Sequence, residues 1–191
     1  MPGEAPLEQA ASGLAPAGDG WFVVNARDAA WATNDAFGSR CVFEASPRVL
    51  PDRPELHRRF EQVGINLDVI APGQASGLYH AEGDQEDFLV LQGECVLLID
   101  GEERPLRAWD FVHCPPGTEH VFVGAGDGPC VIFMVGGRGP AKELRYPRSE
   151  LALARGAGVE TETTSAREAY DPFPRWRPER PASWDDLPWT S

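Results

Sequence analysis

The sequence contains no long hydrophobic segment. No window reaches about 18 uninterrupted apolar residues, so we expect no helix that spans a membrane. The first residues, MPGEAPLEQAASGLAPAGDG, lack the basic start and the continuous apolar run of a secretory signal. We therefore expect a cytoplasmic protein with no membrane contact.

Positive charge is scarce. The chain has 17 Lys and Arg residues against 30 Asp and Glu residues, which gives a formal net charge of -13 and an isoelectric point near 4.7. Such a surface repels phosphate backbones and anionic lipid, so we expect no nucleic-acid partner. The acidic excess favours solubility.

Cysteine and histidine are also few. The four cysteines are Cys41, Cys95, Cys114 and Cys130, and none belongs to a CxxC pair. This spacing excludes a zinc ribbon and a thioredoxin-like motif, so we expect reduced and mostly buried thiols. His113 and Cys114 are neighbours on an expected strand, so they face opposite ways and cannot form a catalytic pair.

Short apolar runs recur from residue 63 onward. Each is closed by glycine or proline, and they occupy residues 65–70, 87–91, 95–99, 110–114, 120–124 and 130–135. Asp-Gly at 100–101 separates two strand-like runs and marks a hairpin. Short strands at this regular spacing predict an all-β sandwich or barrel.

Changes in amino-acid composition and hydrophobic pattern divide the chain into four parts. Residues 1–19 are rich in Ala, Gly and Pro, and we expect a disordered tail. Residues 20–62 should form N-terminal strands and connections, with strands at 21–24 and 41–45 and a short helix in 54–62. Residues 63–137 should form the barrel core. Residues 138–191 should be an extension that packs on the barrel or on a partner subunit. It would have short helices capped by Ser149 and Ser165 and an extended segment rich in Trp and Pro.

A group of metal-ligand side chains precedes and opens the strand at 87–91. His80 and Glu82 share one strand face if residues 78–82 are extended. Glu86 opens the next strand, and His120 begins a later one. Imidazole and carboxylate ligands together suit divalent ions such as Zn, Fe, Mn and Ni. The alternative is a solvated acidic turn with no ion, which is the usual meaning of an isolated His-x-Glu.

The spacing of these residues resembles the two sequence motifs of the cupin family. The first motif corresponds to Gly73, His80, Glu82, Glu86 and Gly93. The second corresponds to residues 115–124, with Pro115-Pro116-Gly117, His120 and Gly124. Glu82 stands where the family has a second histidine, and Gly124 stands where it has an asparagine. The resemblance covers about residues 63–137, and the flanking sequence looks like an uncharacterised bacterial group of cupin-domain proteins.

The resemblance implies a cupin-type jelly roll, a double-stranded β-helix barrel with short helices and the extended C-terminal segment. It also implies a divalent metal ion (Fe, Mn, Zn or Ni) held by His80, Glu82, Glu86 and His120. Glu82 is either a ligand or the catalytic base. The expected pocket walls are Leu78, Phe88, Val90, Phe122 and Met134.

The resemblance implies a small metal-binding cupin that acts on a small organic substrate by oxygenase or isomerase-like chemistry. One alternative is a non-catalytic cupin that binds or senses a small molecule. A second alternative is a metal-free structural or oligomerisation protein. Cupins commonly pair, so a homodimer is expected.

Overall fold

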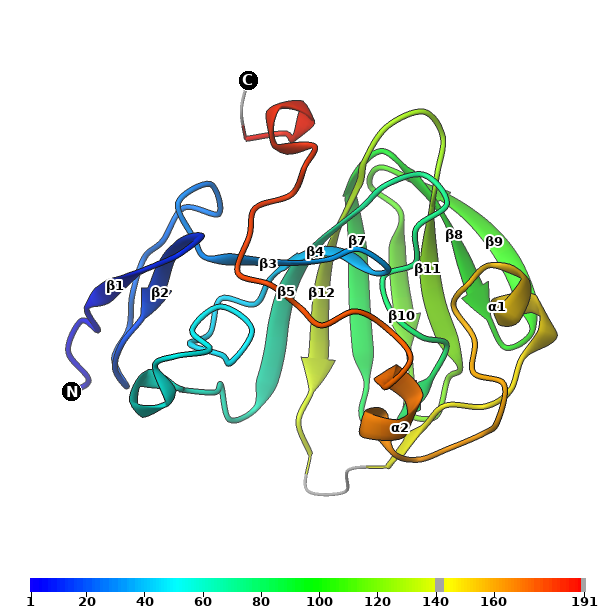
Figure 1. Ribbon diagram of the computed structural model, residues 1–191, viewed down its shortest axis with the longest axis horizontal. Helices are drawn as coiled ribbons and strands as arrows, with labels where there is room; N and C mark the ends of the chain where they lie inside the picture. Colours follow the sequence, from blue (N-terminus) through cyan, green and yellow to red (C-terminus); the bar gives the residue numbers. More distant parts are fainter. Residues whose placement is uncertain (140–142, 190–191) are drawn as a thin grey trace.

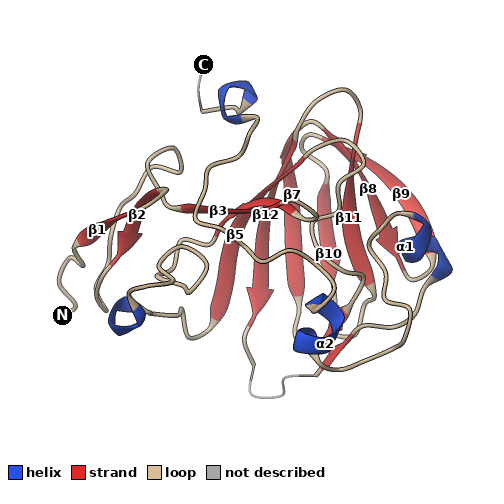
Figure 2. Ribbon diagram, viewed as in Figure 1, coloured by secondary structure: helices blue, strands red, loops and turns tan. Residues whose placement is uncertain are grey.

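The computed structural model describes residues 1–139 and 143–189, and most of its regular structure is β-strand (Figures 1 and 2). The larger sheet has six strands in the order β10-β7-β12-β5-β4-β3. Their bounds are β3 Trp31–Asn34, β4 Gly38–Cys41, β5 Val63–Ile70, β7 Glu86–Gln92, β10 Phe111–Cys114 and β12 Cys130–Gly137. Neighbouring strands in this sheet are antiparallel.

A second antiparallel sheet has the order β11-β8-β9. Its strands are β8 Glu94–Ile99, β9 Glu102–Arg107 and β11 His120–Ala125. The β8–β9 connection has positive φ at both Asp100 (45°) and Gly101 (81°), as a tight two-residue hairpin requires. Bridges from Ala75 to Val123 and from His80 to His120 bring residues 75–80 alongside β11.

The core lies between these two sheets. Alternation along β7 and β11 turns Phe88, Val90 and Phe122 inward, where they meet Ile132 and Met134 of β12. The six predicted apolar runs all coincide with strands, and the expected all-β fold is confirmed.

The outer face of the second sheet is also covered. Val121 and Val123 of β11 point away from the central core and pack with residues of two short helices. These helices are α1 Glu150–Ala154 and α2 Ala166–Tyr170, and the Ser149 and Ser165 side chains accept hydrogen bonds from amides in their first turns, as expected.

Residues 1–19 are not a disordered tail, contrary to the prediction. They contain an antiparallel pair, β1 Leu7–Ala10 and β2 Gly13–Pro16, at one end of the long axis in Figure 1. Ala10 and Ala15 are buried against alanines around β3. Small alanine side chains let the two backbones pack closely. The same alanine-rich composition has low hydrophobicity, which is why these residues looked like a disordered segment.

Three predictions in residues 20–62 are also wrong. Residues 21–24 form no strand, and Trp21 makes only one bridge, to Glu4. The strand expected at 41–45 lies earlier, as β4, because Phe43 has a positive φ of 42° that breaks the extended path. The helix expected in 54–62 is one 3₁₀ turn, η1 Pro54–Leu56, since the backbone of His57 leaves helical geometry.

The C-terminal segment crosses the β3 edge of the large sheet (Figure 1). It includes β13 Leu144–Arg145, which pairs with β6 Ala81–Glu82, and the 3₁₀ turn η2 Trp184–Asp186. Backbone hydrogen bonds of 2.8 and 2.9 Å join Thr33 and Arg177. Trp184 and Trp189 pack against the fully buried Trp31, with ring centroids 5.9 and 5.5 Å away.

The four cysteines are free and buried, as expected. None of the helices in the described part of the chain has the length and apolarity that a membrane span requires.

Candidate functional site

A cavity of about 1200 Å³ lies beside the core, with walls from both sheets and from the C-terminal segment. All four predicted metal ligands line it: His80, Glu82, Glu86 and His120. The two histidines are backbone partners, since the His120 amide donates to the His80 carbonyl at 2.8 Å. Glu86 is the first residue of β7, in the other sheet.

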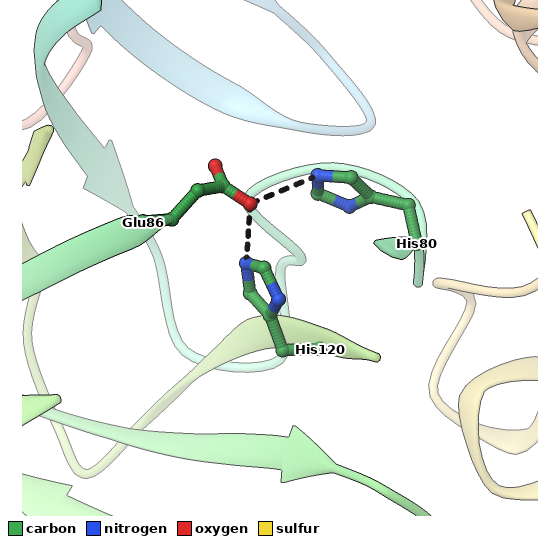
Figure 3. Close-up of side chains that lie close together, drawn as sticks. All are labelled: His80, Glu86 and His120. Carbon is green, nitrogen blue, oxygen red and sulfur yellow. Dashed lines mark ion pairs between the residues drawn. The ribbon is translucent and has the colours of Figure 1, made fainter. Parts of the chain in front are cut away.

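Three of these side chains converge on one point (Figure 3). One ligand atom from each of His80, Glu86 and His120 lies within 4.8 Å of the others. Oε2 of Glu86 is 3.4 Å from Nε2 of His120 and 3.9 Å from Nε2 of His80. These distances are too long for strong hydrogen bonds and leave room between the three atoms.

The remaining ring nitrogens fix the orientation of both imidazoles. Nδ1 of His80 lies 2.8 Å from the Leu78 carbonyl, and Nδ1 of His120 lies 3.1 Å from the Thr118 carbonyl. A carbonyl only accepts, so in each ring Nδ1 carries the hydrogen and the neutral ring presents an Nε2 lone pair to Glu86. Metal-bound histidines are commonly oriented by this same second contact.

Burial disfavours every charged form in this group. It lowers the pKa of His120 to about 4, and the neighbouring His80 lowers that pKa further. Burial also lowers the pKa of His80. Burial raises the pKa of Glu86 to about 8, and the negative charge of the nearby Glu82 carboxylate contributes to this increase. Two neutral imidazoles and a carboxyl that holds its proton are therefore the stable state without a cation.

Glu82 lies at the edge of this group. Its Oε1 is 3.7 Å from Nε2 of His80, but it is outside the set of three atoms that approach one another. Its side chain is 39% exposed, compared with 14% for Glu86. Burial raises its pKa.

The donor set fits a divalent ion. Ligand atoms about 2.1 Å from a tetrahedral ion are roughly 3.4 Å apart. The measured spacing of 3.4 Å from Glu86 to His120 and 3.9 Å from Glu86 to His80 is close to this value. Neutral nitrogen and carboxylate oxygen are ligands for Zn, Fe, Mn and Ni.

The predicted pocket walls are partly wrong. Phe88, Phe122 and Met134 line the cavity, but Leu78 and Val90 do not. Val90 faces the same way as Phe88 but is fully buried in the core. Leu78 packs on the outer face of the second sheet, because residues 78–79 are not part of a strand and the alternation expected over 78–82 does not hold there.

His113 and Cys114 face opposite ways, as predicted. His113 is exposed and its Nδ1 lies 2.7 Å from Asp87, whereas Cys114 is buried.

Sequence reasoning missed the other polar walls of the cavity. Arg40, Arg48, Tyr146, Tyr170 and Trp176 all line it. They come from residues 40–48 and 146–176, and no local motif marks them. Tyr146 lies beside the histidines, with its ring centroid 5.9 Å from that of His80.

The model of the cupin domain family matches residues 66–136 of this chain. The comparison with curated proteins found no match. The matched range contains His80, Glu82, Glu86 and His120 and most of both sheets.

Several solved structures are similar to parts of the chain. A sugar phosphate isomerase of the cupin superfamily from Silicibacter pomeroyi is 28% identical over 59% of this chain and 71% of its own, with a TM-score of 0.44. A Cupin 2 conserved barrel domain protein from Salinispora arenicola is 32% identical over 39% of this chain, with a TM-score of 0.36, and the match spans only 61% of that protein. The polyketide cyclase RemF from Streptomyces resistomycificus is 16% identical over 62% of this chain and 81% of its own, with a TM-score of 0.48.

These structural similarities have TM-scores below 0.5 and do not indicate a substrate for this chain. The family match and the all-β architecture nevertheless agree with each other. Residues 66–136 of this chain match the cupin domain family, and the remaining residues lie outside that match.

Proposed function

We propose that this chain binds one divalent metal ion through His80, Glu86 and His120 and acts on a small organic molecule in the cavity. The observation that carries the proposal is the convergence of two Nε2 lone pairs on one Glu86 oxygen, at 3.4 and 3.9 Å. Three electron-pair donors facing one another in a buried place need a proton or a cation between them.

Fe, Mn, Zn and Ni are the candidate ions, and Glu82 is the fourth ligand or the catalytic base. A bound ion would polarise an oxygen of the substrate or support oxygen chemistry, as isomerases and oxygenases respectively require. Glu82 suits proton transfer because its carboxyl is partly open to the cavity and burial raises its pKa. Phe88, Phe122 and Met134 give the substrate an apolar wall.

The first test is metal content by plasma mass spectrometry on protein purified without a histidine tag. The wild type should carry about one equivalent of a transition metal, or take it up on incubation. His80→Ala and His120→Ala should lose it. His113→Ala is the matched control, because His113 is exposed and lies outside the cluster.

The visible absorption spectrum of the protein with Co²⁺ bound is a second test of the metal site. Co²⁺ in a low-symmetry site with nitrogen and oxygen ligands should give visible bands that vanish in His120→Ala and persist in His113→Ala. Absence of any bound ion in the wild type would contradict the proposal. Metal binding in a protein that turns over no small-molecule substrate would favour the non-catalytic binding or sensing alternative.

A homodimer and a cytoplasmic location stay predictions. Exposed Trp109 and Phe111, at 74% and 64%, lie at the edge strand β10 and could pair with another subunit. Sedimentation analysis of the wild type and of Phe111→Ser tests the homodimer.

A further inference from the structure

Arginine side chains are concentrated around the cavity, although the chain as a whole is strongly acidic. Arginines in its wall are Arg40, Arg48, Arg59, Arg138, Arg167 and Arg175. Two of them are neutralised by buried carboxylates: Arg40 by Asp68, and Arg138 by Glu44. No described carboxylate forms an ion pair with the other four.

Arg40 and Arg48 make an informative pair, because the same indole contacts both. Their guanidinium carbons lie 5.5 and 5.1 Å from the ring centroid of Trp176. Nε of Arg40 donates to Asp68 at 2.6 Å, and its terminal nitrogen donates to the Ser76 carbonyl at 3.2 Å. The charge of Arg40 is therefore balanced by Asp68.

Arg48 has the indole contact but no partner for its charge among the described residues. Arg48 is an exposed residue in the wall of the open cavity, where the surrounding protein and the neighbouring Arg40 lower its pKa to about 10. The side chain is still a cation at neutral pH. The cation–π contact with Trp176 orients the guanidinium and leaves its hydrogen-bond donors free.

Arg48 and the histidine and glutamate cluster line the same cavity, and Tyr146 is a neighbour of both. Arg48 interacts electrostatically with Tyr146, whose ring lies beside His80. Asp84, Glu143 and Asp171 also line the cavity, but none of them is paired with Arg48. The guanidinium is thus available to a molecule that reaches past Tyr146 towards the cluster.

We propose that Arg48 binds the anionic group of a small organic substrate, a carboxylate or a phosphate, while another part of the substrate reaches His80, Glu86 and His120. This assignment of substrate class rests on the proposed function. The planar fork of guanidinium matches both kinds of oxyanion, and the Trp176 contact holds that fork in place.

The test measures anion binding to the full chain after its metal has been removed with EDTA. Inorganic phosphate and acetate are titrated separately by calorimetry at constant ionic strength. Arg48→Met should raise the dissociation constant of the tighter-binding probe about tenfold or more, which is the loss expected for hydrogen bonds to charged groups. Tighter binding of phosphate than acetate would identify a phosphate ligand, and the reverse order a carboxylate.

Arg107→Met is the matched control. Arg107 is exposed, forms no ion pair among the described residues and does not line the cavity, so its loss changes the net charge equally without affecting the site. Arg48→Lys is a second variant that keeps the charge but removes the fork, and it should bind the probe with intermediate affinity. Circular dichroism verifies folding of each variant.

The two proposals fail in different ways. Metal content should be the same in Arg48→Met as in the wild type. If the wild type binds metal but binds neither probe, or binds them equally well without Arg48, the anion site is wrong and the metal site stands. If Arg48-dependent anion binding is present in a chain that takes up no metal, the metal site is wrong and the anion site stands.

Discussion

The replacement Glu86→Gln should change how the stability of the metal-free protein depends on pH. Glu86 is 14% exposed, and its pKa rises from 4.5 to about 8 on folding. A carboxyl with a raised pKa holds its proton more tightly in the folded state, so ionisation destabilises that state. Stability is therefore present at low pH and is lost as pH rises from 4.5 through about 8.

The magnitude follows from the width of the window. Between pH 6 and pH 7.5 the unfolded chain has this carboxyl ionised and the folded chain largely does not. One proton contributes about 1.4 kcal/mol per pH unit, so the titration of Glu86 by itself should lower the free energy of unfolding by about 2 kcal/mol across this window. The buried histidines act in the opposite direction: His120, whose pKa is lowered from 6.5 to about 4, makes the folded state gain about 0.8 kcal/mol between pH 6 and pH 7.5, and the lowered pKa of His80 has the same sign. The prediction is therefore the difference in slope between the wild type and Glu86→Gln, which removes the shared histidine contribution.

Urea unfolding in EDTA at four pH values between 6 and 7.5 measures this slope. Glu86→Gln keeps the size of the side chain and removes its titration, so from pH 6 to pH 7.5 its free energy of unfolding should gain about 2 kcal/mol relative to that of the wild type. Glu61→Gln, at an exposed glutamate, is the control and should behave as the wild type does. Equal slopes in the wild type and in Glu86→Gln would refute the account of this site as a protonated carboxyl beside neutral imidazoles.

Other predictions concern the metal and the core. Metal affinity should rise nearly tenfold per pH unit up to about pH 8, because the ion must displace the proton of Glu86, and competition with a chelator measures this. Arg40→Met should cost about 3–5 kcal/mol in urea unfolding because it leaves Asp68 buried and unpaired, and adding Asp68→Leu should recover much of that loss. Trp31→Ala should cost about 3–5 kcal/mol, since the ring is fully buried between Trp184 and Trp189. Ser149→Ala should cost about 1 kcal/mol by removing the cap of α1, as thermal unfolding will show.

The central strands could be predicted because their pattern is local. Apolar runs closed by Gly or Pro coincide with β5, β7, β8, β10, β11 and β12. The same alternation places Phe88 and Phe122 on one face of their strands, and both side chains line the cavity. It does not account for Leu78, because residues 78–79 are not part of a strand.

The N-terminal hairpin and the cationic side of the cavity could not be predicted for a different reason. Alanines of β1 and β2 are buried by contacts with residues 30–50, and nothing in their own composition reveals such a partner. Arg48 and Trp176 are far apart in sequence, and only the folded chain brings them together. Interactions between distant segments therefore account for most of what the sequence did not show.

The placement of Trp176 has a consequence for the order of events during synthesis. Both sheets are complete by residue 137, so the cupin domain can fold while later residues are still being made. The cavity cannot be complete at that stage, because Trp176 and Arg177 have not yet been synthesised, and Arg177 is the residue whose backbone bonds to Thr33. A chain arrested shortly after residue 137 should therefore have both sheets folded, while Arg48 lacks its aromatic contact and β6 lacks its partner strand β13.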